Sequence, residues 1–122
     1  MYTPEYTRKL VNFCAMLEQA QVTRMKQQFP NTPFLHNQPV EVNDGRVYSR
    51  ITIEKGARYF VRVKDGAIFA SKSFKTPTLA RQYGTLDTIE QFDWSGYNAV
   101  ALPNSNFTMR MTNSHYMTAV PK

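Results

Sequence analysis

Between residues 40 and 74 the chain alternates apolar and polar side chains, and turn-forming residues interrupt the alternation at three places. A two-residue period is typical of β-strands that bury one face. The interruptions are Asp44-Gly45, Glu54-Lys55-Gly56 and Asp65-Gly66, and Asp-Gly is a favourable sequence for a tight hairpin turn. The segment therefore predicts a four-stranded antiparallel meander over residues 40–74.

The turns fix an expected register and, with it, an expected core face. With two-residue loops in the first and third hairpins and a three-residue loop in the second, the expected pairs include Val42 with Val47, Ile53 with Ala57 and Val63 with Ile68. All three turns place the same alternate residues on one side of the sheet. The predicted core face consists of Val40, Val42, Val47, Ser49, Ile51, Ile53, Ala57, Tyr59, Val61, Val63, Ile68, Ala70 and Phe74.

The residues before the meander predict an N-terminal helix over about residues 4–29. Thr3 can cap this helix, Pro4 suits its first position, and Glu5 suits the positive end of the helix dipole. At helical spacing, one apolar stripe consists of Tyr6, Leu10, Phe13, Cys14 and Leu17, and a second stripe, rotated from it, of Val22, Met25 and Phe29.

Residues 75–122 are less regular. Thr76-Pro77 predicts a short helix that ends near Gly84, and residues 87–93 predict a helical turn. We also expect a strand over residues 97–102, a final hairpin from residues 107–112 and 116–120, and anchoring roles for Phe74 and Trp94. The predicted fold is a single α+β domain, mostly β, over residues 1–122: a helix followed by a strongly bent meander. A small Sm-like or SH3-like barrel is the preferred architecture, and an open antiparallel sheet with the helix packed across it is the alternative.

Positive charge is concentrated in the middle of the chain. The whole chain has 15 basic and 9 acidic residues, a formal net charge of +6. Residues 46–81 alone hold nine basic residues against two acidic ones, whereas the flanking segments are neutral or slightly acidic. Local excess charge of this kind steers a polyanion toward one region of a protein.

The face opposite the predicted core alternates cations with aromatic rings. In the expected register Tyr48 lies opposite Arg62, Arg50 opposite Phe60, and Arg62 opposite Phe69. Cations can bind phosphates and exposed rings can stack on unpaired bases, so this face predicts a single-stranded nucleic-acid surface. The alternatives are a solvated face and a face covered by the helix or by another subunit. The candidate binding residues are Arg46, Tyr48, Arg50, Arg58, Phe60, Arg62, Lys64 and Phe69.

No motif in the chain predicts catalysis, a cofactor or a metal site. Cys14 lies on the apolar stripe of the helix, which favours a structural thiol over a nucleophile. Neither histidine has a neighbouring His or Cys at metal-ligand spacing. Asp87, Glu90 and Asp93 recur every third residue, but acidic residues that begin a short helix are the commoner reason for this pattern. We therefore expect a non-enzymatic protein.

Two further features concern location. The chain has no run of about 18 apolar residues, so no membrane-spanning helix is expected, and residues 1–5 lack the basic and apolar regions of a signal peptide. A single cysteine fits a reducing compartment.

Two segments resemble a pattern found in small uncharacterised proteins of marine tailed phages, including phages of cyanobacteria. They are Lys72-Ser73-Phe74-Lys75, followed by Pro77 and Arg81, and Asp93-Trp94-Ser95-Gly96-Tyr97. The similarity covers about residues 46–100; the long helix, Phe74 in place of the usual Trp, and the extension after Leu102 depart from it. The resemblance implies a phage protein that acts in the cytoplasm of the infected host or in the virion, and it implies no activity. The expected partners are single-stranded nucleic acid or, in the alternative of a protein–protein interaction module, a second copy, a host protein or a virion protein.

Overall fold

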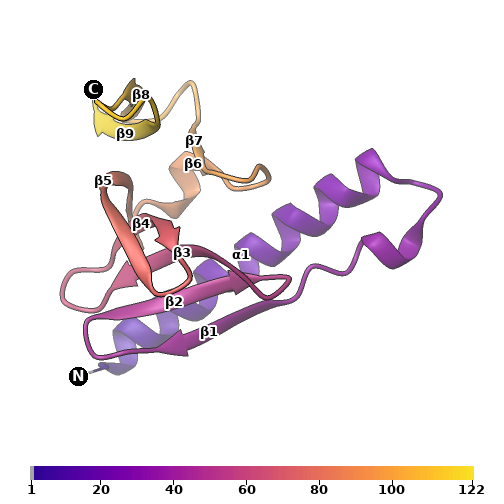
Figure 1. Ribbon diagram of the computed structural model, residues 1–122, viewed down its shortest axis with the longest axis horizontal. Helices are drawn as coiled ribbons and strands as arrows, with labels where there is room; N and C mark the ends of the chain where they lie inside the picture. Colours follow the sequence, from indigo (N-terminus) through magenta and orange to yellow (C-terminus); the bar gives the residue numbers. More distant parts are fainter. Residues whose placement is uncertain (1) are drawn as a thin grey trace.

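The computed structural model describes residues 2–122, which form one long helix, an antiparallel meander and two small hairpin sheets (Figure 1). The elements are α1 (Pro4–Gln28), η1 (Pro33–Leu35), β1 (Val40–Asp44), β2 (Tyr48–Ile53), β3 (Gly56–Arg62), β4 (Ala67–Ser73), β5 (Thr76–Thr85), η2 (Ile89–Gln91), β6 (Phe92–Asp93), β7 (Val100–Ala101), β8 (Phe107–Met111) and β9 (Met117–Pro121). The order of strands in the main sheet is β1-β2-β3-β4-β5. The α+β, mostly β fold is confirmed.

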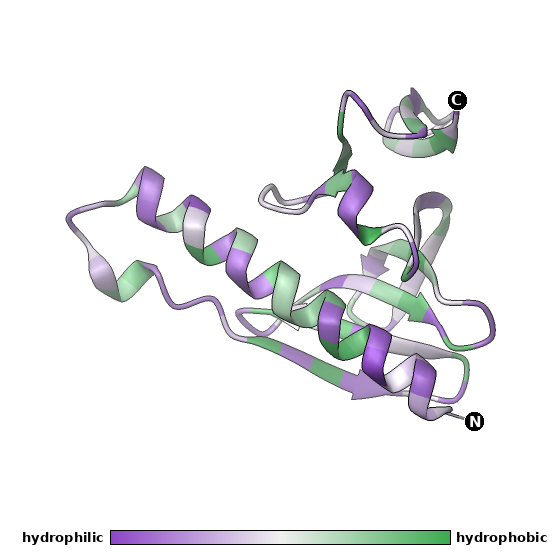
Figure 2. Cartoon of the chain, turned by 180° about the vertical axis from the view of Figure 1, so that it is seen from behind, coloured by the Kyte–Doolittle hydropathy of each residue, from purple (hydrophilic) through white to green (hydrophobic). Residues whose placement is uncertain are grey.

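Helix α1 begins and ends as its sequence predicts. The hydroxyl oxygen of Thr3 accepts a hydrogen bond from the backbone N–H of Tyr6 at 3.0 Å, and Pro4 occupies the first turn. The first apolar stripe is buried against the sheet except for Cys14, which is half-buried, whereas Phe29 is 40% exposed. Figure 2 shows α1 crossing one side of the sheet, with its C-terminal half continuing past the strands. No helix in the described part of the chain has the length and hydropathy of a membrane span.

The core lies between α1 and the sheet, and the predicted core face supplies most of its strand residues. Tyr59, Val61, Ile51 and Ile68 are fully buried there, and so is Ser49. The Ser49 hydroxyl bonds to the Tyr6 hydroxyl at 2.7 Å and donates to Asp44 Oδ1 at 3.0 Å, so this buried hydroxyl is satisfied. Three members of the predicted face are instead exposed: Val42, Val47 and Phe74.

The predicted registers of the first and third hairpins are wrong, and that of the second hairpin is correct only away from its turn. Val42 pairs with Ile51, not Val47, and Ile68 pairs with Val61, not Val63. In the second hairpin Ile51 pairs with Tyr59 as predicted, but Ile53 pairs with Gly56. The turn there contains Glu54 and Lys55, both at positive φ, and a bulge after Ile51 restores the register of the rest of the hairpin.

The predicted helix after Thr76-Pro77 is wrong, because this segment is strand β5. Pro77 pairs with Ser71 and Thr85 with Ala67, so β5 runs back along β4. A proline is compatible with a strand that forms one end of a sheet. Further along, β5 lies beside β9: the Gln82 backbone N–H donates to the Thr118 hydroxyl at 2.9 Å, and that hydroxyl donates to the Gln82 carbonyl at 3.2 Å.

The sheet is open, so the preferred barrel is wrong and the five-stranded sheet with α1 packed across it is observed. Among the described residues, β1 and β5 are the two ends of the strand order and do not pair with one another. Closure would require that pairing, but β5 faces β9 instead. The final hairpin is confirmed as β8 and β9, the predicted helical turn contains η2, and the strand expected over residues 97–102 is shorter, as β7.

Carbonyl oxygens of the loop after β6 are held by side chains from α1 and β3. Gln21 is 3% exposed, and its Nε2 donates to the carbonyls of Trp94 and Gly96 at 2.7 and 3.0 Å. Arg24 Nη1 donates to the Ser95 carbonyl at 3.1 Å. Arg58 Nη1 donates to the carbonyls of Gly96 and Tyr97 at 3.4 and 3.0 Å. We name these contacts to residues 94–97 the carbonyl clamp.

Cys14 should react slowly with thiol reagents while the protein is folded. Burial raises the pKa of its thiol from the usual 9.0 to about 11. Because the thiolate is the nucleophile, a shift of this size lowers the reactive fraction roughly 100-fold near pH 8. Reaction with a chromogenic disulfide should therefore be at least roughly 100-fold slower for the folded protein than for protein in a denaturing concentration of guanidinium chloride. Equal rates would show that the thiol is open to solvent.

Candidate nucleic-acid interface

The aromatic residues of the predicted face pack on one another. The Tyr48 ring meets Phe60 and Phe69 edge-on, with centroids 6.1 and 6.3 Å apart. Phe60 is 3% and Phe69 2% exposed. The expectation that these two rings offer free stacking surfaces is wrong, because Phe60 lies opposite Phe69 in the sheet and the rings shield each other. This face carries a small second apolar layer.

The predicted cations of this face do not form one continuous surface. Arg62 forms a two-pronged ion pair with Asp65, at 3.0 and 2.7 Å, and its guanidinium lies 5.1 Å from the Phe69 ring centroid. This contact lowers the pKa of the Asp65 carboxyl. Arg50 is half-buried with its guanidinium 4.2 Å from the Phe74 ring centroid. Arg58 reaches the carbonyl clamp on the helix side.

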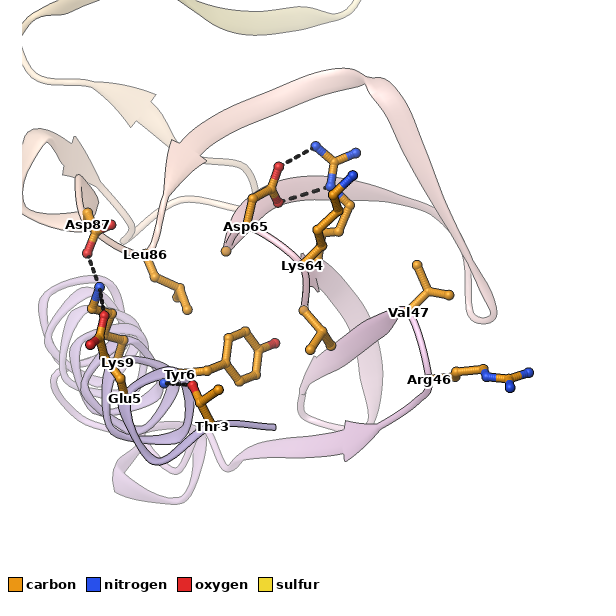
Figure 3. Close-up of a pocket in the computed structure, with 13 residues that line it drawn as sticks. Thr3, Glu5, Tyr6, Lys9, Arg46, Val47, Lys64, Asp65, Leu86 and Asp87 are labelled. Carbon is orange, nitrogen blue, oxygen red and sulfur yellow. Dashed lines mark hydrogen bonds and ion pairs between the residues drawn. The ribbon is translucent and has the colours of Figure 1, made fainter. Parts of the chain in front are cut away.

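Arg46 and Lys64 border a cleft of about 540 Å³ between the beginning of α1 and the loops after β1, β3 and β5 (Figure 3). The other charges in this cleft are paired. Lys9 contacts Glu5 at 3.0 Å and Asp87 at 2.7 Å, and Arg62 contacts Asp65. Figure 3 shows Arg46 directed away from the remaining lining residues. The cleft thus combines carboxylates with cations and presents no converging set of free cations.

A second concavity, of about 240 Å³, has a different charge pattern. It is lined by Ala57, Arg58, Ser71, Lys72, Ser73, Phe74, Arg81, Tyr97 and Asn98, and we name it the cationic groove. Three of these residues are basic, and no lining residue is acidic. The ion pairs found within residues 2–122 involve only Lys9 and Arg62 as cations, so the three groove cations have no carboxylate partner there.

Aromatic rings accompany the cations of the cationic groove. Tyr97 is 67% exposed, and the Arg58 guanidinium lies 4.3 Å from its ring centroid. Phe74 is 50% exposed, so its predicted role as a core anchor is wrong. Arg81 donates to the Tyr83 hydroxyl at 3.1 Å and lies 4.6 Å from the centroid of the Tyr116 ring. Burial lowers the pKa of Arg58, but arginine starts so far above neutrality that the group stays charged.

Of the predicted site residues, the cationic groove contains only Arg58. Lys72, Phe74, Arg81 and Tyr97 belong to the two segments that resemble the phage pattern, and the fold brings these segments together. The residues that carry the resemblance therefore meet at this groove, although Phe74 taken alone favoured a structural role. Trp94, from the same pattern, is buried as predicted.

The acidic residues considered for a metal site do not gather. Asp87 pairs with Lys9, and the Asp93 carboxylate accepts from the backbone N–H and the hydroxyl of Ser95 at 2.9 and 2.6 Å, which lowers its pKa. Residues 2–122 contain no group of three or more His, Cys, Asp or Glu side chains placed to hold a metal ion. Comparisons with protein-family models, with curated proteins and with solved structures find no significant match for this chain.

Proposed function

We propose that this protein is a non-enzymatic single-strand nucleic-acid-binding protein whose contact surface is the cationic groove. The observation that carries the proposal is the joint presence of three cations without carboxylate partners and two rings that are at least half exposed. Cations in a groove attract the phosphate backbone, and exposed rings stack on unpaired bases without regard to sequence.

The geometry favours a single strand over a duplex. The groove is small, at about 240 Å³, and the Arg58 guanidinium lies over one face of the Tyr97 ring. In a duplex the flat faces of the bases are covered by their neighbours, so Tyr97 and Phe74 would find only phosphate and sugar. An unstacked strand offers both phosphates and base faces at once.

Reversing the charge of Lys72 should weaken binding, whereas the same change far from the groove should not. Lys72 is exposed and makes no ion pair, so Lys72→Glu is expected to lower affinity at least tenfold. Lys26→Glu, at the far end of α1, changes the net charge equally and is expected to lower it less than about twofold. Fluorescence anisotropy with a labelled single-stranded oligonucleotide of about 15 nucleotides measures both.

The salt dependence of the same titration reports the number of phosphates contacted. Three groove cations on a single strand predict a slope of log affinity against log salt near −2, or roughly a 20-fold loss between about 50 and 200 mM. The proposal fails if no saturable binding occurs at low salt. It also fails if the two lysine variants lose affinity equally, because overall charge would then explain the binding.

A protein–protein interaction module is the second candidate, and one observation favours it. The C-terminal half of α1 and η1 project beyond the sheet, and Phe34 in η1 is 78% exposed (Figure 1). A second copy, a host protein or a virion protein are the partners that this candidate implies. Light scattering coupled to size exclusion separates self-association from a monomer. The phage origin, in the infected host or the virion, stays a prediction from the resemblance.

A further inference from the structure

A second groove of about 330 Å³ adjoins the cationic groove and shares Arg81 and Asn98 with it. Its remaining lining is mostly apolar: Tyr83, Ala99, Val100, Met109, His115, Tyr116 and Met117. We name it the methionine groove. Because the two concavities share these two residues, they lie next to one another, and we call the pair the track: one part is lined by cations, the other mostly by apolar side chains.

We infer that the methionine groove holds an unpaired nucleobase of the strand whose phosphates lie in the cationic groove. This inference rests on the proposed function and identifies what distinguishes a single strand from a duplex at this site. The track matches the chemistry of a nucleotide, because a charged phosphate and a flat, weakly polar base are joined by a short sugar.

The lining of the methionine groove suits a base in three respects. The Tyr116 ring is 56% exposed, and Arg81 covers it at 4.6 Å, which leaves area for a second flat group. The thioethers of Met109 and Met117 are polarizable and adapt to the edges of flat rings. The Asn98 amide, shared by the two grooves, carries both a donor and an acceptor for the polar edge of a base.

The exposed apolar side chains of the methionine groove lie beside a cation. Val100 and Met117 are 52% and 40% exposed, yet they lie beside Arg81. Phe34, by contrast, is exposed on η1, an element that contains no basic residue. Charge complementarity with a polyanion and adjacency to the cationic groove therefore favour a base over a protein side chain as the occupant of the methionine groove.

The test compares single-stranded and duplex DNA of the same mixed sequence, by anisotropy, for the wild type, Tyr116→Ala and Tyr116→Phe. The wild type should prefer the single strand. Tyr116→Ala should lower single-strand affinity roughly tenfold and leave duplex affinity unchanged, whereas Tyr116→Phe, which keeps the ring, should bind like the wild type. Circular dichroism melting checks that both variants are folded. An oligonucleotide with abasic sites should bind the wild type and Tyr116→Ala equally.

Three outcomes overturn the inference. Equal binding of single strand and duplex by the wild type would overturn it while leaving the cationic groove as the contact surface. The same conclusion would follow if Tyr116→Ala preferred single-stranded over duplex DNA as strongly as the wild type does. If Tyr116→Ala changed the molar mass measured by light scattering but left the oligonucleotide affinity unchanged, the groove would be assigned to self-association. Absence of binding to either DNA would instead remove the proposed function, and this inference with it.

Discussion

Replacing Trp94 with alanine is expected to lower the free energy of unfolding by about 3–5 kcal/mol. Trp94 is 2% exposed and lies at the centre of the core, where its ring meets Phe13 and Tyr59 at centroid distances of 4.7 and 5.3 Å. Its indole N–H donates to the Ile89 carbonyl at 2.7 Å. Truncation removes the buried ring surface, leaves a cavity between α1 and β3, and leaves that carbonyl without its donor.

Urea unfolding followed by circular dichroism measures this loss, because Trp94 is the single tryptophan and the variant has no indole fluorescence. Trp94→Phe is the matched control: it keeps an aromatic ring but loses the hydrogen bond, and we expect a loss of about 1–2 kcal/mol. Small domains are typically stable by about 5–15 kcal/mol, so Trp94→Ala would leave little margin. A loss below about 1 kcal/mol would mean that Trp94 is not a central core residue.

In β1 to β4 most residues lie on their predicted faces, although the registers of the first and third hairpins were not predicted. In the first hairpin the observed partner of Val42 lies four positions beyond the predicted one, and in the third the partner of Ile68 lies two positions away. Shifts by an even number keep every side chain on its predicted face. The alternation of apolar and polar residues therefore predicts the faces, whereas the length of each loop depends on side-chain contacts that this alternation does not reveal.

Those contacts are visible in the third hairpin. The Asp65 carboxylate accepts from Arg62 and from the Ala67 backbone N–H at 3.1 Å, and the Gly66 N–H donates to the Arg62 carbonyl at 2.7 Å. Gly66 has a φ of 75°, which a glycine adopts without strain. Together these bonds close a longer loop than Asp-Gly alone would suggest. The Arg62–Asp65 pair thus sets the turn length and removes Arg62 from the predicted free cations.

Strand β5 and the cationic groove escaped prediction for a related reason. Thr76-Pro77 suits a helix start locally, but pairing along β4 and contact with β9 decide the structure of the segment. Once β5 is a strand, Arg81 lies near Lys72 and Tyr97 at the cationic groove. A site assembled from β3, β4, β5 and the loop after β6 depends on this pairing, which residue spacing does not encode.

Gln21→Glu is expected to destabilise the protein by at least about 3 kcal/mol at neutral pH. The substitution keeps the shape of the side chain but replaces the buried amide donor with a second oxygen, which then faces the carbonyl oxygens of Trp94 and Gly96. Arg24 and Arg58 already donate to carbonyls of the same loop. If either arginine turned to pair with the new carboxylate, it would give up its hydrogen bond in the carbonyl clamp. Gln19→Glu, at an exposed position of the same helix, should change stability by less than about 0.5 kcal/mol.

The loss should depend on pH with a defined sign. Burial and the facing carbonyls raise the pKa of the introduced carboxyl in the folded state above its unfolded value of about 4.3. Between these two pKa values the folded state binds more protons than the unfolded state, so the deficit relative to wild type should shrink as pH falls toward 4.3 and grow as pH rises. Urea unfolding at a series of pH values measures this deficit, with Gln19→Glu showing no such trend.

Because the carbonyl clamp positions Tyr97, Gln21→Glu should also weaken oligonucleotide binding at neutral pH. A clamp that is only structural would leave that affinity unchanged in the folded fraction.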